Sequence, residues 1–192
     1  MPTTKILAFA GSLRKESYNK KLAKAALAGA KAAGADVTFL DLADIPMPLF
    51  DEDLEARDGL HPNARKFKDL LLAHHGFIIA SPEYNSSVSG ALKNAIDWAS
   101  RPVPGEKPLE CFGGKVAAII AASPGALGGL RGLVTLRMIL SNIQVLVLPD
   151  QHAVVHADKV FDAQGRMTDD KQRERVEAIG RKLADTARCL GS

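Results

Sequence analysis

A run of hydroxyl, amide and cationic side chains follows the first apolar segment and leads into an Ala- and Lys-rich stretch typical of a helix. Free backbone N–H groups and the helix dipole favour an anion at a helix N-terminus, and Arg14 adds forked donors with a fixed positive charge. A terminal phosphate, with a charge of about −2, suits this donor set. The alternative is a polar strand-to-helix loop whose Ser and Asn side chains serve only as caps. The run consists of Gly11, Ser12, Leu13, Arg14, Lys15, Glu16, Ser17, Tyr18 and Asn19.

The same run lacks the glycines of two common nucleotide-binding loops. A dinucleotide fingerprint has three spaced glycines, G-x-G-x-x-G, and only Gly11 is present here. A Walker A loop ends in Gly-Lys-Ser or Gly-Lys-Thr, which the run does not contain. The pattern therefore favours a ligand with a single terminal phosphate over a dinucleotide.

Two further loops carry features that suit a ligand. Residues 81–90 are rich in turn formers, and Tyr84 lies in their middle, so backbone groups could contact the edge of a flat heteroaromatic ring while Tyr84 covers a face. Residues 123–129 contain three glycines, which permit backbone and ligand to approach closely. The alternatives are a β–α turn with Tyr84 half buried, and a flexible turn before a helix.

Five short apolar runs alternate with helical patterns along the chain. This alternation predicts β–α units and a parallel sheet, and right-handed crossovers leave few topologies. We therefore expect an α/β fold, a three-layer, doubly wound, five-stranded parallel sheet, with ligands bound beyond the carboxyl ends of the strands. The expected strands are Ile6–Ala10, Val37–Leu40, Phe77–Ala80, Val116–Ala121 and Val145–Leu148, and the expected helices are Tyr18–Ala33, one from Pro62, Ala91–Ala99, Leu130–Ile143 and one from about Thr168.

Local patterns add four expectations to this fold. Residues 43–61 contain two prolines, a glycine and six acidic side chains, which predicts a long loop. Pro149 is expected to end the fifth strand. Three lysines are expected on the solvated face of the first helix, and four apolar residues on the inner face of the last. The lysines are Lys20, Lys21 and Lys24, and the apolar residues are Val176, Ile179, Leu183 and Leu190.

Composition limits the classes of function. The 192 residues match the length of one domain, about 100–200 residues, so residues 1–192 are expected to form a single domain. Aromatic residues make up 5% of the chain, too few for the stacking platforms of single-stranded nucleic-acid binders. The net charge of +3 is too small and too scattered to indicate a protein that binds the phosphate backbone of nucleic acid.

Cysteine usage and the N-terminal segment indicate a cytoplasmic protein. Cys111 and Cys189 lie far apart without C-x-x-C spacing, so we expect two reduced thiols. The first apolar run is only about five residues long, shorter than the apolar region of a secretory signal, and no later run reaches the length of a membrane span.

The three loops together resemble those of the flavodoxin-like NAD(P)H-dependent FMN reductases, a family that includes quinone, chromate and azo-dye reductases. The pattern Gly-Ser-x-Arg-x-x-Ser-x-Asn occurs at residues 11–19. Residues 82–85, Pro-Glu-Tyr-Asn, and the helix pattern at residues 90–98 look like the family's isoalloxazine loop and the helix after it. Ser123 with the later Gly-Gly-x-Arg resembles its third loop. The similarity covers nearly the whole chain.

The resemblance implies bound FMN, with NADH or NADPH as the reducing substrate. The acceptors that it implies are quinones or similar compounds: chromate, ferric chelates, free flavin or azo dyes. Because the flavin carries the chemistry, we expect no catalytic side chain and no metal. The cofactor-binding residues that it implies are Ser12, Leu13, Arg14, Lys15, Glu16, Ser17, Tyr18, Asn19, Pro82, Glu83, Tyr84, Asn85, Ser86 and Ser123.

One position departs from the family pattern. Ser89 stands where many members have proline, so we expect a looser loop around the flavin ring.

The resemblance also implies a partner subunit, in a homodimer or homotetramer. The helix after the third loop supports this, because Leu130, Val134 and Met138 add apolar side chains beyond its inner stripe, and such a helix can be buried on both sides. The alternative is that a neighbouring helix of the same chain covers it.

Three other functions fit the sequence less well. A flavodoxin-like electron carrier is the main alternative, but such carriers are typically strongly acidic, in order to attract basic partners. Metal-dependent hydrolysis would need more than His74, His75, His152 and His156, because neither a cysteine ligand nor an H-E-x-x-H motif accompanies them. DNA binding through the lysines of the first helix is weaker still.

Overall fold

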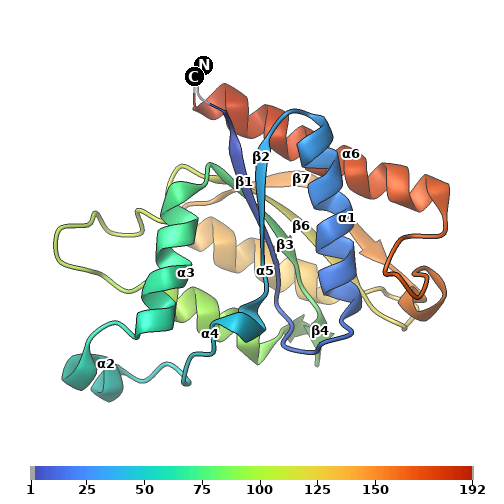
Figure 1. The fold of residues 1–192 in the computed structure, drawn as a ribbon. Coiled ribbons are helices and arrows are strands. Elements are labelled where there is room, and N and C mark those ends of the chain that lie inside the picture. Colours follow the sequence, from blue (N-terminus) through green and yellow to red (C-terminus); the bar gives the residue numbers. More distant parts are fainter. Residues whose placement is uncertain (1–2, 192) are drawn as a thin grey trace.

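A five-stranded parallel sheet forms the centre of the molecule (Figure 1). The computed structural model describes residues 3–191. The strand order is β2-β1-β3-β6-β7, the doubly wound order of flavodoxin-like folds, so the expected fold class is confirmed. The sheet strands are β1 (Lys5–Ala10), β2 (Asp36–Leu40), β3 (Gly76–Ala80), β6 (Val116–Ala122) and β7 (Leu146–Val154).

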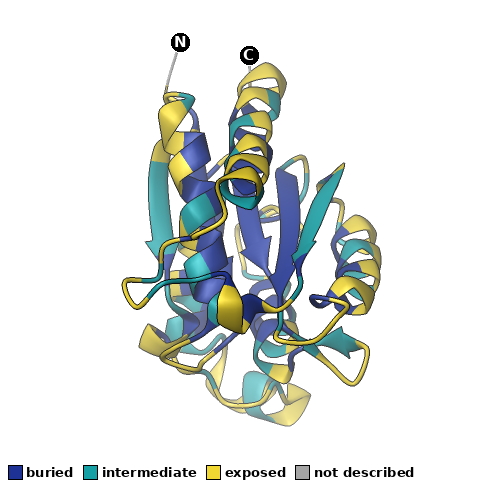
Figure 2. Cartoon of the chain, turned by 90° about the vertical axis from the view of Figure 1, so that its right-hand side faces the viewer, coloured by how far each residue is buried: buried dark blue, intermediate teal, exposed yellow. Residues whose placement is uncertain are grey.

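Helices cover both faces of the sheet, which explains why β1, β3 and β6 are almost wholly apolar. Residues Ile6 and Ala8 of β1 pack into a core beneath α1 and α6, whereas Leu7 and Phe9 pack into the core on the opposite face. Figure 2 shows the buried inner surfaces of both layers. The first face carries α1 (Tyr18–Ala32) and α6 (Asp170–Leu190), and the second carries α3 (Pro62–Ala73), α4 (Gly90–Ala99) and α5 (Leu130–Asn142).

The strand register brings the loops after β1, β3 and β6 to one edge of the sheet. Ala10 pairs with Ala80, and Ala80 pairs with Ile120, so the carboxyl ends of these strands lie level. Three parallel strands that end level place their following loops side by side, as the sequence predicted.

Close packing between α1 and α6 depends on two glycines. A Cβ atom on Gly29 would overlap the carbonyl group of Glu177, and one on Gly180 would overlap the carbonyl oxygen of Ala26. The two helix backbones therefore touch, which fixes α1 and its N-terminal end against the body of the fold.

The segment 43–61 is not one long loop. It contains a short 3-10 helix, η1 (Leu42–Asp44), and a helix, α2 (Glu52–Asp58). Asp51 caps α2 by accepting a hydrogen bond from Asp53 N at 2.8 Å, and acidic residues in the first turn favour the helix dipole. None of the residues of α2 is buried, so its apolar pattern was too weak to reveal it.

Pro149 does not end the fifth sheet strand, which continues to Val154. The pairing with β6 shifts in register here, because Ala117 pairs with Val147 but Ile119 pairs with Gln151. Pro149 falls in this irregularity on an edge strand, where no N–H is needed for the ladder.

Two side chains lie on the side opposite to the one expected. Lys20 is only 6% exposed, because its Nζ lies 2.7 Å from Asp41 Oδ2 after β2. Leu190 is 53% exposed, although Val176, Ile179 and Leu183 are buried as expected. Small residues of α6, Ala184 and Ala187, take the inner positions near its end.

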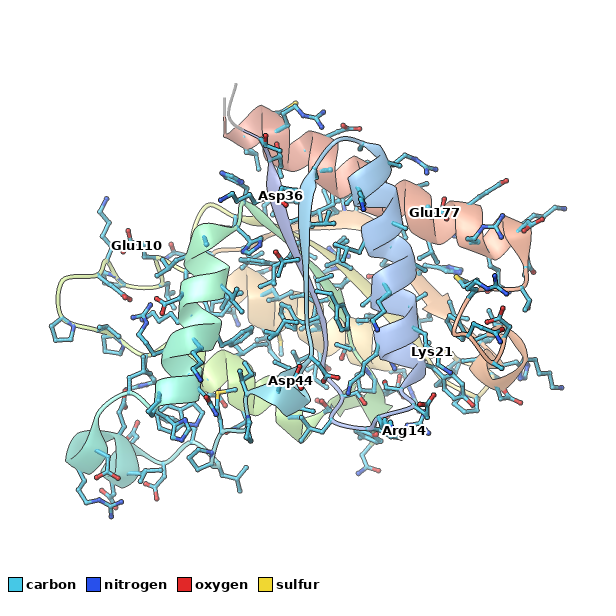
Figure 3. All side chains as sticks on the ribbon, in the orientation of Figure 1. Arg14, Lys21, Asp36, Asp44, Glu110 and Glu177 are labelled. Atoms are coloured by element: carbon cyan, nitrogen blue, oxygen red, sulfur yellow. The ribbon has the colours of Figure 1, made fainter. Side chains whose placement is uncertain are left out.

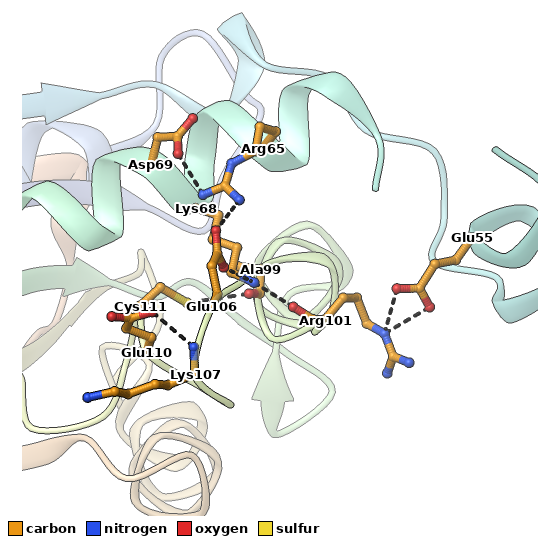
Figure 4. A network of polar contacts seen from close by, with 10 residues as sticks. All are labelled: Glu55, Arg65, Lys68, Asp69, Ala99, Arg101, Glu106, Lys107, Glu110 and Cys111. Atoms are coloured by element: carbon orange, nitrogen blue, oxygen red, sulfur yellow. Dashed lines mark hydrogen bonds and ion pairs between the residues drawn. The ribbon is translucent and has the colours of Figure 1, made fainter. Parts of the chain in front are cut away.

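A buried cation anchors the connection between α4 and β6 (Figure 4). Lys68 of α3 is 2% exposed; its Nζ lies 2.8 Å from Glu106 Oε2 and donates to Arg101 O at 2.5 Å. Arg65 reaches the same carboxylate at 2.5 Å. Cys111 is buried in this connection, and burial raises the pKa of its thiol to about 11, which keeps it protonated at neutral pH.

None of the described helices is long and apolar enough to cross a membrane.

Candidate functional site

A cavity of about 210 Å³ lies at the carboxyl edge of the sheet, where the three loops meet. Most of the residues predicted to bind the cofactor line it. The lining residues are Ser12, Arg14, Ser17, Tyr18, Asn19, Pro82, Glu83, Tyr84, Ala122, Ser123 and Pro124.

The N-terminus of α1 forms one wall of the cavity. Ser17 is the N-cap residue, and its Oγ accepts a hydrogen bond from Lys20 N at 3.4 Å. Ser12 Oγ accepts one from Arg14 N at 3.3 Å. Both hydroxyl groups keep a hydrogen to donate, and the N–H groups of the first helical turn have no acceptor within the helix. These donors fit a phosphate group.

Asn19 joins two of the three loops. Its Nδ2 donates to Ala122 O, and its Oδ1 accepts from Ala122 N, both at 2.9 Å. The amide thus ties α1 to the end of β6 and is engaged within the protein. Asn19 lines the cavity as predicted, but the geometry gives it a role in holding the loops together.

Arg14 lies on the exposed loop that precedes α1, as Figure 3 shows. Its guanidinium carbon lies 5.1 Å from the centre of the Tyr18 ring, within the range of a cation–π contact. Lys21, one turn further along α1, lies 3.4 Å from the Glu16 carboxylate. Arg14 and Tyr18 both line the cavity, and the neighbouring Glu16 carboxylate is paired with Lys21.

A short β-hairpin with a two-residue turn follows β3, and sequence analysis missed it. Strands β4 (Glu83–Tyr84) and β5 (Ser87–Val88) are antiparallel. Asn85 and Ser86 both have positive φ, 50° and 65°, as the central residues of a type I′ turn do. Tyr84 is 60% exposed beside the cavity, so its ring is available to a ligand. The dipeptide Asn85-Ser86 was the only local signal for this turn.

Glu83 fastens the hairpin to α5. Arg131 Nε donates to Glu83 Oε1 at 2.8 Å, and Gly132 N donates to Glu83 Oε2 at 3.1 Å. Burial alone would raise the pKa of Glu83, but the Gly132 N–H and the Arg131 guanidinium together lower it below its ordinary value. Glu83 is therefore a carboxylate at neutral pH and does not serve as a proton donor.

Ser89 stabilises the loop at which we expected a looser structure. It is buried; its Oγ donates to Gly11 O at 2.5 Å and accepts from Leu92 N at 3.1 Å. One hydroxyl thus caps α4 and bridges the first loop to the second. A proline at this position could make neither bond, so the expectation was wrong.

The third loop is held by the end of β7. Ser123 N donates to Val154 O at 3.1 Å, and Ala157 N donates to Ser123 O at 3.0 Å. Ser123 Oγ accepts from Gly125 N at 3.2 Å and keeps its hydrogen for a ligand. Gly129 has φ of 94°, and a Cβ there would lie 2.8 Å from that of Ala121, so only glycine fits where α5 begins.

The remaining predicted residues lie beside the cavity rather than on its wall. Leu13 lines a second, adjoining cavity of about 210 Å³ together with Ile45 and Met47. Lys15, Glu16, Asn85 and Ser86 are exposed at the tips of the first two loops. Ala122 and Pro124 line the main cavity but were not predicted, because neither has a polar side chain to attract attention.

The histidines take no part in this cavity. His74 is buried, with Nδ1 2.6 Å from Leu70 O and Nε2 2.9 Å from Thr38 Oγ1. His75 Nδ1 accepts from Lys5 N at 2.9 Å. Within residues 3–191, no group of three or more His, Cys, Asp or Glu side chains is arranged to hold a metal ion.

Comparison with known protein families identifies the family of this chain. The model of the NADPH-dependent FMN reductase family matches residues 4–159, which include all three loops. The chain belongs to this family. It is an oxidoreductase with FMN as cofactor and NAD(P)H as substrate, and the donors at the N-terminus of α1 fit a phosphate group.

Relatives and solved structures agree. The chain is 40% identical, over 90% of its length and 89% of the relative's, to an NAD(P)H-dependent FMN reductase of Pseudomonas aeruginosa. It is 34% identical to an NADPH:quinone oxidoreductase of Arabidopsis thaliana, over 93% and 89% of the two chains. Its fold matches FerB, an NAD(P)H:acceptor oxidoreductase of Paracoccus denitrificans, with a TM-score of 0.81, 28% identity and coverage of 98% and 99%.

Proposed function

We propose that the FMN phosphate binds at the N-terminus of α1, between Ser12, Arg14 and Ser17. The support is the donor set: two hydroxyl groups with a free hydrogen, the N–H groups of the first helical turn and one guanidinium, all on one wall of the cavity. Charge-assisted bonds to a dianion are the strongest hydrogen bonds available to a protein. Lys15 and Glu16 do not line the cavity with Arg14, so in this proposal they contribute only backbone N–H groups of the loop.

The isoalloxazine ring, in this proposal, lies between the hairpin and the third loop. Pro82 and Tyr84 line the cavity from one side, and Ser123 and Pro124 line it from the other. The Oγ hydrogen of Ser123 and the backbone of residues 82–86 then contact the polar edge of the ring. The exposed ring of Tyr84 is available to cover a face.

FMN held by these residues would supply the redox chemistry by which NAD(P)H reduces an acceptor. The protein residues bind and orient: they hold the phosphate, fix the ring and leave one ring face open. Glu83 is held as a carboxylate by Arg131, so we assign it no role as an acid. The proposal names no catalytic side chain, because a bound flavin would carry the chemistry.

Quinones are the acceptors that we propose first. The support is the similarity to quinone oxidoreductases along almost the whole chain, together with an open cavity that suits a flat, small substrate. The cytoplasm, where NAD(P)H is available, is the proposed location. Chromate, ferric chelates, free flavin and azo dyes could use the same open face.

Two measurements test this function. Mass spectrometry of the cofactor released by heat should identify FMN; FAD, or no flavin even after reconstitution, would refute the proposal. Steady-state turnover with NADH and NADPH across quinone, chromate, ferric chelate, flavin and azo-dye acceptors should show quinone reduction as the most efficient. A flavin that NAD(P)H reduces only very slowly would instead indicate the electron-carrier function.

We further propose a homodimer in which α5 packs against its copy. Leu130, Val134 and Met138 form an apolar stripe at i, i+4 spacing, 44%, 66% and 58% exposed. The flanking cations are bound within the chain: Arg131 to Glu83, and Arg137 NH2 to Leu148 O at 2.8 Å. A twofold axis beside Val134 would pair Leu130 with the Met138 position of the second copy, as an isologous interface requires.

The size of the cavity also favours a second copy. At about 210 Å³ it is smaller than pockets that enclose ligands of this size, roughly 300–1,000 Å³. The α5 stripe begins next to the hairpin that lines the cavity, because Gly132 bonds to Glu83. A subunit packed on α5 therefore extends toward the open side of the flavin site.

A further inference from the structure

Three side chains form a stack that connects the segment after β7 to the phosphate loop. The rings of Phe161 and Tyr18 are nearly parallel, with an angle of 17° and 6.2 Å between their centres. The guanidinium of Arg14 lies 5.1 Å from the centre of the Tyr18 ring. We call Arg14, Tyr18 and Phe161 the Arg14 stack. Of these three residues, Arg14 and Tyr18 line the cavity and Phe161 does not, so Phe161 would act on a ligand through the other two.

The segment that carries Phe161 is rigid by its own hydrogen bonds. Phe161 pairs with Met167 in an isolated antiparallel bridge. The carboxylate of Asp162 accepts from Gln164 N at 2.9 Å, from Arg166 N at 2.8 Å and from Arg166 Nε at 2.9 Å. Asp162 N also donates to Arg166 O at 2.9 Å. These bonds close a short loop, residues 161–167, and fix the backbone that carries the Phe161 ring.

Arg14 needs such support because little else holds it. Its side chain is exposed and lies on a loop, and within residues 3–191 no ion pair includes it; the nearby Glu16 carboxylate is paired with Lys21 instead. A long side chain such as that of arginine loses much rotamer freedom when it binds a ligand. Stacking on an aromatic face restricts the guanidinium before the phosphate arrives.

We propose that Phe161 is a positioning residue of the phosphate site: through Tyr18 it holds the Arg14 guanidinium toward the FMN phosphate. The segment after β7 thereby becomes a fourth element of a site that the loops after β1, β3 and β6 form. This inference rests on the phosphate site proposed above.

Affinities for FMN and riboflavin test the inference, because riboflavin has the ring but not the phosphate. Removal of an aromatic partner weakens such contacts by a factor of about two to ten. Phe161→Leu should raise the FMN dissociation constant by about that factor in fluorescence titrations and leave the riboflavin constant unchanged. Phe161→Tyr keeps the ring and should bind FMN like the unchanged protein.

A second cation–π pair provides a matched control. The Nζ of Lys24 in α1 lies 4.8 Å from the centre of the Phe39 ring in β2, and neither residue lines the cavity. Phe39→Leu should change neither flavin affinity. Thermal unfolding of both Leu variants shows whether they fold equally well.

The double variant Arg14→Ala/Phe161→Leu separates the mechanisms. Once Arg14 is absent, Phe161→Leu should cause no further loss of FMN affinity. An undiminished further loss, an equal loss for both flavins, or unchanged FMN binding in Phe161→Leu would overturn the inference. If Arg14→Ala itself leaves the preference for FMN over riboflavin intact, the proposed phosphate site fails as well; if only Phe161→Leu is without effect, the inference alone fails.

Discussion

The guanidinium of Arg131 and the carboxylate of Glu83 join α5 to the β4–β5 hairpin, with Nε and Oε1 2.8 Å apart. The adjacent Gly132 N–H donates to the second carboxylate oxygen at 3.1 Å. A Cβ atom on Gly132 would lie 3.2 Å from Ser87 O, so the helix approaches the hairpin closely. The position of Tyr84 is therefore set by α5, the same helix that carries the exposed apolar stripe.

This pair makes stability depend on pH. The folded-state pKa of Glu83 is lowered from its ordinary value of 4.5, against the opposing effect of burial, by the Gly132 N–H and Arg131. The stabilisation is therefore fully present above pH 4.5 and is lost as the pH falls through the lower folded pKa. Glu83→Gln should unfold at lower urea concentration than the unchanged protein near neutral pH, and the difference should shrink in acid.

The control for this pH experiment is Glu177→Gln, because the partly exposed Glu177 carboxylate lies 3.8 Å and 3.6 Å from two arginines of the same helix, α6. Surface pairs of this kind contribute about 0–1 kcal/mol. A difference between Glu83→Gln and the unchanged protein that stays constant at all pH values would contradict the assignment of a lowered pKa.

Removal of Arg14 tests the phosphate site directly. Charge-assisted hydrogen bonds contribute about 1.5–3 kcal/mol, so Arg14→Ala should raise the FMN dissociation constant about 10–150-fold. Lys15→Ala is the matched control, since that neighbouring cation is exposed and does not line the cavity. Equal effects of the two substitutions in fluorescence titration would indicate general attraction by positive charge instead of a specific contact.

Gly180 should not tolerate alanine, although alanine favours helices. A Cβ at this position would overlap Ala26 O and lie 3.0 Å from Ala30 N, so α1 and α6 would have to move apart. Overpacking of this kind costs about 1–3 kcal/mol, measurable as a lower free energy of unfolding in urea. Gly90→Ala is the control: no atom lies within 4 Å of the added Cβ, and its effect should stay within about 0.5 kcal/mol.

The α5 stripe predicts the state of association. Sedimentation at low micromolar concentration should give twice the chain mass of 20.5 kDa. Val134→Glu would place two like charges opposite each other at the proposed axis and should yield a monomer, whereas Lys171→Glu on exposed α6 should not. A single species at the mass of one chain for the unchanged protein would refute the dimer.

The sequence alone was sufficient for the features that depend on neighbouring residues. Continuous apolar runs marked the buried strands β1, β3 and β6, because strands covered on both faces need no polar alternation. Ser17 caps α1, as a serine at a helix start commonly does, and α6 begins at Asp170, two residues after the expected start at Thr168. Since parallel strands end at one edge, the order of the loops also indicated which of them converge.

Only the tertiary structure decided which side chains meet. Asn19 bonds to Ala122, 103 positions away, Lys20 is buried against Asp41 in the segment after β2, and Phe161 stacks on Tyr18. Periodicity reports whether a residue faces inward or outward, but these contacts depend on which distant segment the fold places opposite. For the same reason Pro149 could lie within β7: its missing N–H matters only if a neighbouring strand requires it, and at the irregular sheet edge none does.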